Sequence, residues 1–325
     1  MNTLLEEIKI QDFKDFKIGN AEYKESPTGC TVILPNEQGA VCAIDVRGGG
    51  PASREVALLD PLAANDSVNA VVLSGGSAFG LEASIGVMQF LEERNIGFKV
   101  AEGVVPIVVE SCLYDLEMHD SKKRPDKQLG YKAARFALEN NYQDGNYGAG
   151  CGATCGKAYG KEHMMKTGIG SSCFKLGDLI VGAVVAVNSM GDVFDYKTNQ
   201  QLAGAINYET NEFLNCEEAL YNMHINTLHT NTTIGIILTN AKLNKTQLTK
   251  VAGMAHDGMA RSINPIHTEY DGDSIYSMSS SKVEADINVV GTLAARAFSE
   301  AITSSVINAD SSFNIKSYKD LNDLD

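Results

Sequence analysis

Short apolar runs recur along the chain at the length of buried β-strands. The first four are rich in β-branched residues and bounded by Gly, Pro or Asn, and two longer ones follow later in the chain. They are CTVILP (30–35), AVCAIDV (40–46), NAVVLS (69–74), VPIVV (105–109), LIVGAVVAVN (179–188) and TTIGIILTN (232–240). We therefore predict a core made of β-sheet.

Helical patterns alternate with these strands. Residues 77–94 are rich in Ala, Leu, Glu and Met and follow a Gly-Gly turn, and a second helix is predicted over about 131–140. Two later helices are predicted from apolar faces: Leu248, Val251, Ala252, Ala255 and Met259, then Ile287, Val290, Ala294, Ala301 and Ser305. No repeat or linker divides the chain, which favours a single layered α/β domain over residues 1–325.

Two polar stretches interrupt this pattern. A glycine-rich loop (145–157) has neither helical nor strand periodicity, and a connector (195–231) separates two strands, with a short helix predicted within 211–225. The connector ends in NTLHTN (226–231), which has neither core apolar residues nor a turn signature. We expect that end to be exposed and cleavable, and the tail after Ala309 to be peripheral.

Charge narrows the classes of partner. With 27 basic and 41 acidic side chains the net charge is −14, which disfavours binding to nucleic acid or to anionic membranes. The N-terminal segment mixes charges of both signs, unlike a signal peptide, and no apolar run reaches the roughly 20 residues of a membrane span. We expect a cytoplasmic protein.

Several motifs suggest chemistry but fail in detail. GAGCGATCGKA resembles a phosphate-binding loop, yet Cys151 and Ala158 stand where that motif needs glycine and a hydroxyl. Ser77 follows a strand as in a nucleophile elbow, but Phe79 replaces the second glycine. Cys151 and Cys155 form a CxxxC without a partner pair, and the six histidines show no ligand spacing. We expect no metal, no cofactor and, with seven scattered cysteines, no disulfide.

A carboxylate pair in YDGD is a better candidate. Asp271 and Asp273 are two residues apart, so an extended backbone would direct both side chains to one site. The same letters also suit an ordinary exposed turn. Thr232, which opens the TTIGIILTN run, is by itself only a good β-former.

Seven ordered blocks together resemble one known family. They are SPTGCTVI (26–33), AIDVRGGGPASRE (43–55), NAVVLSGGSAFGLEASIGV (69–87), GAGCGATCGK (148–157), LGDLIVGAVVAVN (176–188), NTTIGIILTNA (231–241) and HTEYDGDSIYSMS (267–279). The chain is similar to the β-aminopeptidases and L-aminopeptidase/D-esterases, a family that includes the nylon-oligomer (6-aminohexanoate-oligomer) hydrolases. Asn231-Thr232 and the Asp-Gly-Asp triplet resemble that last branch, whereas many aminopeptidases have Gly-Ser and Ser-x-Glu.

The resemblance implies a fold and a self-activating enzyme. The fold would be a four-layer α/β/β/α sandwich of N-terminal-nucleophile type. The chain would cut itself between Asn231 and Thr232 into residues 1–231 and 232–325, and Thr232 would become the nucleophile. Asp271 and Asp273 match the acidic pair that assists the nucleophile.

The resemblance also implies supporting roles near the scissile amide. Asn188 matches the oxyanion-binding asparagine, and Tyr114 and Lys157 match positions beside that amide. The freed α-amino group of Thr232, with a reference pKa of about 7.7 to 8.0, would be a built-in base.

The leading interpretation is an amidase or aminopeptidase acting on small peptides, amino-acid amides or short oligoamides with a free amine. Members of the family are commonly homo-oligomers, so a tetramer or larger assembly is expected. Two alternatives stay open. One is an uncleaved, non-catalytic member that binds a small metabolite, and the other is a serine hydrolase that uses Ser77.

Overall fold

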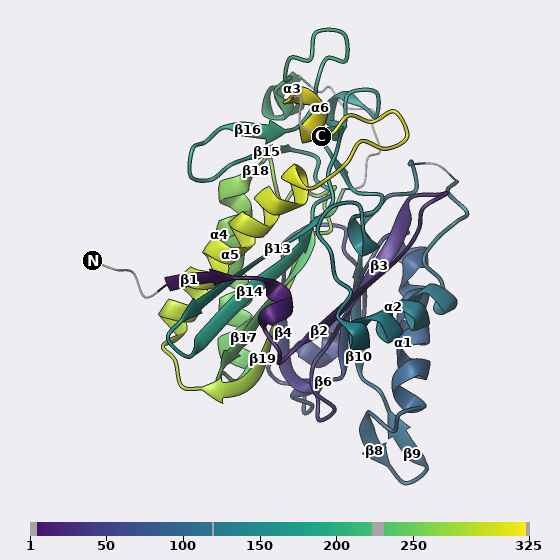
Figure 1. Cartoon of the computed structure of the whole chain (residues 1–325), viewed down its shortest axis with the longest axis vertical. Coiled ribbons are helices and arrows are strands. Elements are labelled where there is room, and N and C mark those ends of the chain that lie inside the picture. The colour runs from purple at the N-terminus through teal and green to yellow at the C-terminus, as the bar shows by residue number, and fades with distance from the viewer. Residues whose placement is uncertain (1–4, 119, 223–230, 323–325) are drawn as a thin grey trace.

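Two β-sheets packed face to face form the centre of the molecule. The computed structural model describes residues 5–118, 120–222 and 231–322. Figure 1 shows the two sheets between helices α4 and α5 on one side and helices α1 and α2 on the other. The architecture is therefore the predicted α/β/β/α sandwich.

The larger sheet contains the strands that surround the candidate site. Its order is β1-β13-β14-β17-β19-β4-β6, and β17 and β19 are parallel neighbours at its centre. The strands are β1 (Leu5–Ile8), β13 (Ile169–Leu176), β14 (Leu179–Ala186), β17 (Ile234–Ala241), β19 (Ser274–Val283), β4 (Ala40–Val46) and β6 (Ser67–Val68).

The second sheet has five strands in the order β2-β3-β7-β10-β5. They are β2 (Lys17–Tyr23), β3 (Thr28–Leu34), β7 (Ala70–Ser74), β10 (Val108–Cys112) and β5 (Ala52–Arg54). A hydrogen bond of 2.7 Å joins the Ser111 hydroxyl of β10 to the Tyr276 hydroxyl of β19, so a polar contact also links the sheets.

Four helices cover the outer faces of the sheets. They are α1 (Ala83–Glu92), α2 (Lys127–Glu139), α4 (Lys245–Ser262) and α5 (Ile287–Ile307). Alternate residues of β14 face opposite layers: Ala183 and Val185 lie in the core that includes Phe298 of α5, whereas Val184 and Ala186 lie between the sheets. Burial on both faces explains why this strand is a continuous apolar run.

Smaller elements extend from both ends of the sandwich. They are α3 (Cys216–Asn222), α6 (Tyr318–Leu321), β8 (Phe98–Val100), β9 (Gly103–Val105), β11 (Thr154–Cys155), β12 (Met165–Lys166), β15 (Asp192–Phe194), β16 (Gln201–Ala203) and β18 (Ile263–Asn264), with 3₁₀ turns at Ile10–Asp12, Val56–Leu59, Ser77–Glu82, Gly148–Gly150 and Lys157–Tyr159. None of the helices in the described part of the chain has the length and apolar character of a bilayer span.

The run predicted over 105–109 is divided between β9, which ends at Val105, and β10, which begins at Val108, whereas the other five predicted strands are confirmed with small shifts at their ends. The last begins at Ile234 instead of Thr232, and the helix predicted over 77–94 is a 3₁₀ turn followed by α1. Helix α2 begins four residues before the predicted 131, because the Asp126 side chain accepts the Leu129 N–H at 2.8 Å and caps it. The pattern analysis missed β13, whose two central serines interrupt its apolar run.

The candidate site lies at one edge of the larger sheet. Ile234 at the start of β17 pairs with Ser274 at the start of β19, and it also pairs with Ala186 at the end of β14. Residues that immediately precede β17 and β19, and those that follow β14, are therefore brought together at this edge.

Candidate functional site

The Asn231-Thr232 peptide bond is buried at this edge. Asn231 and Thr232 are 1% and 4% exposed. Asn231 pairs in parallel with Asp271: its N–H donates to the Tyr270 carbonyl at 2.9 Å, and its carbonyl accepts the Gly272 N–H at 3.0 Å. The expectation of an exposed bond is therefore wrong for Asn231, because this backbone is hydrogen-bonded to the Asp-Gly-Asp segment. The preceding residues 226–230 lie outside the described part of the chain.

The Thr232 hydroxyl contacts the carbonyl group of the residue before it. Its Oγ1 donates a hydrogen bond to the Asn231 carbonyl oxygen, which also accepts the Gly272 N–H. The Thr232 N–H in turn donates to the Asn188 carbonyl at 2.8 Å. The Gly272 N–H is the donor that matters for chemistry at Asn231, because an N–H aimed at a carbonyl oxygen stabilises the negative charge that develops on that oxygen when the carbonyl carbon is attacked.

Both aspartates are buried. Asp271 and Asp273 have no exposed surface, which corrects the interpretation of the triplet as an exposed turn. The triplet directly precedes β19, which is hydrogen-bonded on both sides by β17 and β4. A turn in that position is covered by its neighbours.

Asp273 is held by three N–H donors. Its Oδ1 accepts the Thr233 N–H at 2.8 Å, and its Oδ2 accepts the His267 Nδ1–H at 2.8 Å and the His267 backbone N–H at 3.2 Å. Charge-assisted hydrogen bonds of this kind stabilise an ionised carboxylate. The bond to Thr233 also fixes Asp273 beside the candidate nucleophile.

Asp271 has one oxygen free. Its Oδ2 accepts the Thr268 N–H at 2.8 Å and the Thr268 hydroxyl at 2.6 Å, while its buried Oδ1 has no hydrogen-bond partner among the described residues. Burial is the larger cause and the negative charge of Asp273 the second, and together they raise the pKa of Asp271 to about 6. A buried carboxylate with a free oxygen and a pKa near neutrality is suited to accept a proton.

Asn188, Lys157 and Tyr114 form a second group beside the bond. The Asn188 side-chain oxygen accepts the Lys157 ammonium at 2.7 Å and the Thr154 N–H at 3.2 Å, and its amide donates to the Tyr114 carbonyl at 2.8 Å. Lys157 also lies 3.5 Å from Glu117, and burial lowers the pKa of the Lys157 ammonium. The structure thus brings all the predicted site residues to one edge of the sheet, with Tyr114 present through its backbone.

Gly272 has a role that the sequence analysis missed. A Cβ placed at this residue would lie 2.8 Å from Thr232 Oγ1, 3.0 Å from the Gly50 carbonyl oxygen and 3.2 Å from the Pro51 Cα. Only glycine lets the backbone donor approach the Asn231 carbonyl without displacing the hydroxyl. The sequence did offer a clue to this role: a glycine stands between the two candidate aspartates, and glycine is favoured where backbones approach closely.

Replacing Gly272 by alanine is expected to slow the self-cleavage and amide turnover that the resemblance implies by about 10- to 100-fold, because the added methyl group would push Thr232 Oγ1 away from the Asn231 carbonyl. Time courses followed by intact mass and by amide hydrolysis would measure this. As a control, Gly177→Ala adds a methyl group with nothing within 4 Å, although at a positive φ of 61°. Equal rates in Gly272→Ala and the unchanged chain would contradict the prediction.

Two further residues support the aspartates. His267 and Thr268 open the HTEYDGD block, and their side chains bind Asp273 and Asp271 respectively. The sequence analysis gave His267 no role, because the spacing of the histidines matches no ligand motif. The usable signal was the short distance along the chain from His267 to the carboxylate pair.

The residues behind the other motifs lie elsewhere or lack partners. Ser77 begins a 3₁₀ turn, and no hydrogen bond between its hydroxyl and a histidine is found among the described residues. Cys151 and Cys155 are buried free thiols, and burial raises the pKa of Cys151 to about 12. In the described ranges no three His, Cys, Asp or Glu side chains are grouped to hold a metal ion.

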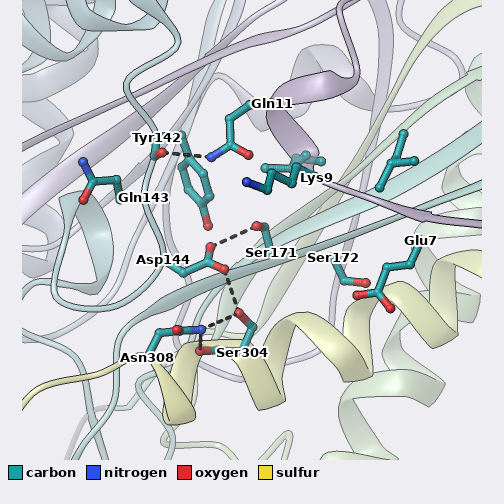
Figure 2. Close-up of a pocket in the computed structure, with 12 residues that line it drawn as sticks. Glu7, Lys9, Gln11, Tyr142, Gln143, Asp144, Ser171, Ser172, Ser304 and Asn308 are labelled. Atoms are coloured by element: carbon teal, nitrogen blue, oxygen red, sulfur yellow. Dashed lines mark hydrogen bonds between the residues drawn. The ribbon is translucent and has the colours of Figure 1, made fainter. Parts of the chain in front are cut away.

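A cavity of about 750 Å³ lies away from the predicted site. Figure 2 shows Asp144 at its centre, accepting hydrogen bonds from the Ser171 and Ser304 hydroxyls at 2.9 and 2.7 Å. Tyr142 and Gln11 form another side of the cavity. None of the predicted site residues lines it.

Comparison with known proteins identifies the family. The model of peptidase family S58 matches residues 9–318. An uncharacterized aminopeptidase of Mycobacterium leprae is 35% identical over 331 residues, covering 89% of this chain and 85% of that protein. A 6-aminohexanoate-oligomer endohydrolase of Kocuria sp. is 32% identical over 279 residues, covering 84% of this chain and 75% of that protein.

A solved structure gives the same fold. The L-aminopeptidase D-Ala-esterase/amidase of Ochrobactrum anthropi, described as a variant of the Ntn hydrolase fold, superposes with a TM-score of 0.67 at 17% identity. The match covers 95% of this chain and 90% of that chain. The predicted fold and the resemblance on seven sequence blocks are both confirmed.

Proposed function

Because this chain belongs to peptidase family S58, we propose that it is an amide hydrolase that cuts its own Asn231-Thr232 bond and then uses Thr232 as nucleophile. One observation carries the proposal. The Thr232 hydroxyl contacts the Asn231 carbonyl, whose oxygen also accepts the Gly272 N–H, and the segment paired with Asn231 supplies Asp271 with a free carboxylate oxygen.

Self-cleavage would proceed by an N-to-O acyl shift. Asp271 accepts the hydroxyl proton as Thr232 Oγ1 attacks the Asn231 carbonyl carbon, and the Gly272 N–H stabilises the oxyanion. The C–N bond then breaks and the proton passes to the departing nitrogen, which leaves an ester between Asn231 and Thr232. Water hydrolyses the ester to a carboxylate on Asn231, a free hydroxyl and a free α-amine on Thr232.

Substrate hydrolysis would reuse the same oxygen. The freed α-amine of Thr232 starts beside the Asn188 carbonyl, which already accepts its N–H in the uncleaved chain, and there it can accept the hydroxyl proton. The Asn188 side-chain amide is the proposed donor to the substrate oxyanion. Lys157 holds that amide in orientation through the Asn188 side-chain oxygen.

The proposed substrates are small peptides, amino-acid amides and short oligoamides with a free amine. Family membership and the aminopeptidase and oligomer-endohydrolase relatives support amide bonds as the target. The net charge of −14 favours an approaching cationic amine. Turnover of α-amino, β-amino and 6-aminohexanoyl amides by the purified protein would rank these substrates.

Intact-mass measurement tests the proposal directly. An active preparation should contain two associated pieces, residues 1–231 and 232–325, because β17 remains in the sheet between β14 and β19 after the cut. An active preparation that contains only the 34.9 kDa chain would overturn it. A full-length chain that binds a metabolite without turnover would instead favour the non-catalytic alternative.

Self-cleavage and substrate hydrolysis are expected to lose rate at different acidic pH. In the uncleaved chain the Thr232 nitrogen is an amide, so Asp271 is the base, and self-cleavage should fall as pH drops through about 6, where that carboxylate becomes protonated. Hydrolysis uses the freed amine and should fall below roughly pH 8. Conversion of newly synthesised chain and kcat/KM for an amide would be measured across pH. Coincident acid limbs would mean that one base serves both reactions.

A further inference from the structure

We infer that His267 is a positioning residue for the proposed reactions: its ring and its backbone together fix Asp273 beside Thr232. This inference rests on the proposed function. His267 Nδ1 and its backbone nitrogen lie 2.8 and 3.2 Å from the same oxygen, Asp273 Oδ2. The carboxylate has no hydrogen to give to the ring, so the ring nitrogen is the donor.

The backbone of His267 is held in an uncommon conformation. Its φ is +60°, in the left-handed region that non-glycine residues rarely adopt. In this conformation the backbone N–H and the ring of His267 both lie within hydrogen-bond distance of one atom, Asp273 Oδ2. Strained backbone of this kind is concentrated at functional sites.

A second histidine packs against the ring. His256 of α4 lies edge-on to His267, with ring centroids 4.8 Å apart and planes at 73°. Its Nε2 donates to the Asp45 carbonyl at 3.1 Å, and burial lowers the pKa of His256 to about 4. His256 is therefore neutral near pH 7 and places no positive charge against the ring of His267.

The charged groups around this pair are few. Asp271 and Asp273 face His267 from the turn before β19. The charges of Asp45, in β4, and of Arg47, the residue that follows β4, affect the pKa of His256. Asp273 has three N–H donors, whereas Asp271 has a free oxygen. His267 thus supplies two of the three donors that hold Asp273 in place, whereas Asp271 keeps an oxygen free to accept a proton.

Two substitutions of His267 separate the effect of its ring N–H donor from the effect of its backbone conformation. Glycine and asparagine both tolerate φ near +60°, but only asparagine offers an N–H close to the position of the histidine Nδ1. His267→Gly should lower kcat and the self-cleavage rate by about 10- to 100-fold, with KM within about twofold. His267→Asn should restore both rates to within about fivefold of the unchanged chain.

The pH profile separates positioning from a structural role. In His267→Gly the acid limb of self-cleavage should move down from about pH 6, because Asp273 is no longer held beside Asp271 and its negative charge then raises the pKa of Asp271 less. His163→Asn is the matched control, since that ring binds the Ile206 carbonyl and neither aspartate. It should leave the rates and the acid limb unchanged.

Three results would overturn the inference. One is unchanged rates and an unchanged acid limb in His267→Gly. Another is an equal loss in the Gly and Asn variants without a pH shift, which would indicate a structural role. If the Gly variant fails to fold, a folded Asn variant with a large loss of kcat would also overturn it. Failure of the unchanged chain to cleave itself would instead count against the proposed function.

Discussion

Replacing Thr232 by alanine is expected to give a folded, full-length chain that neither cleaves itself nor hydrolyses amides. Both reactions use the same oxygen, so its loss should reduce each rate by roughly 10⁴-fold or more. The fold should survive, because the change removes one methyl group and a hydroxyl that binds only the adjacent carbonyl, at a cost of about 1 kcal/mol. Intact mass, thermal unfolding and amide turnover would measure the three effects.

Two neighbouring substitutions provide the controls. Thr232→Ser keeps the nucleophilic oxygen and should retain part of both activities, although loss of the methyl group frees χ1. Thr233→Ala should behave nearly as the unchanged chain, because Asp273 binds the Thr233 backbone N–H and the Thr233 hydroxyl has no hydrogen-bond partner among the described residues. An active Thr232→Ala together with an inactive Thr233→Ala would move the nucleophile by one residue. If both stayed active, self-activation would be wrong.

Asp271→Asn should block self-cleavage while preserving the fold. The new side chain has the same shape, and its oxygen can keep both bonds from Thr268 while its amide occupies the place of the free Oδ1. Only the negative charge and the capacity to accept a proton are lost. Self-cleavage should slow by about 10²- to 10⁴-fold, and amide turnover should fall with it, since Thr232 keeps no free amine. Normal maturation of this variant, measured by intact mass, would remove Asp271 from the mechanism.

The matching change at Asp273 should also affect stability. An asparagine there either turns its NH₂ toward the N–H donors of His267 or turns it toward the Thr233 N–H. Either arrangement leaves buried donors facing each other, at a cost of about 1 to 3 kcal/mol. Asp273→Asn should therefore lower the melting temperature as well as the rates, which differs from the expectation for an exposed turn. An unchanged melting temperature would contradict the expected cost of the unpaired donors.

Sequence pattern was sufficient for the main layers of the sandwich. The apolar run that forms β14 and the helical face of Leu248, Val251 and Met259 identified elements that are buried in the core. Such patterns are informative because burial acts on each element locally through its period of 2 or 3.6 residues. Element ends were less accurate, as at α2, because a cap such as Asp126 can extend a helix beyond its apolar face.

Residue resemblance supplied the list of candidate site residues, and the tertiary structure placed them together. Thr232, Asn188 and Asp273 are far apart along the chain but meet where β14 ends and where β17 and β19 begin. Periodicity alone left Thr232 an ordinary β-former and the aspartates an ordinary turn. No local pattern carries the information that these segments are neighbours.

The tertiary structure alone decided how the site is buried and hydrogen-bonded. DGD is favourable turn chemistry in any context, and only its position between inner strands makes both carboxylates inaccessible. The Gly272 N–H reaches Asn231 across 41 residues of chain, and His267 binds Asp273 through a backbone conformation that histidine does not favour. Sequence preferences are local, whereas these contacts depend on which strands lie side by side.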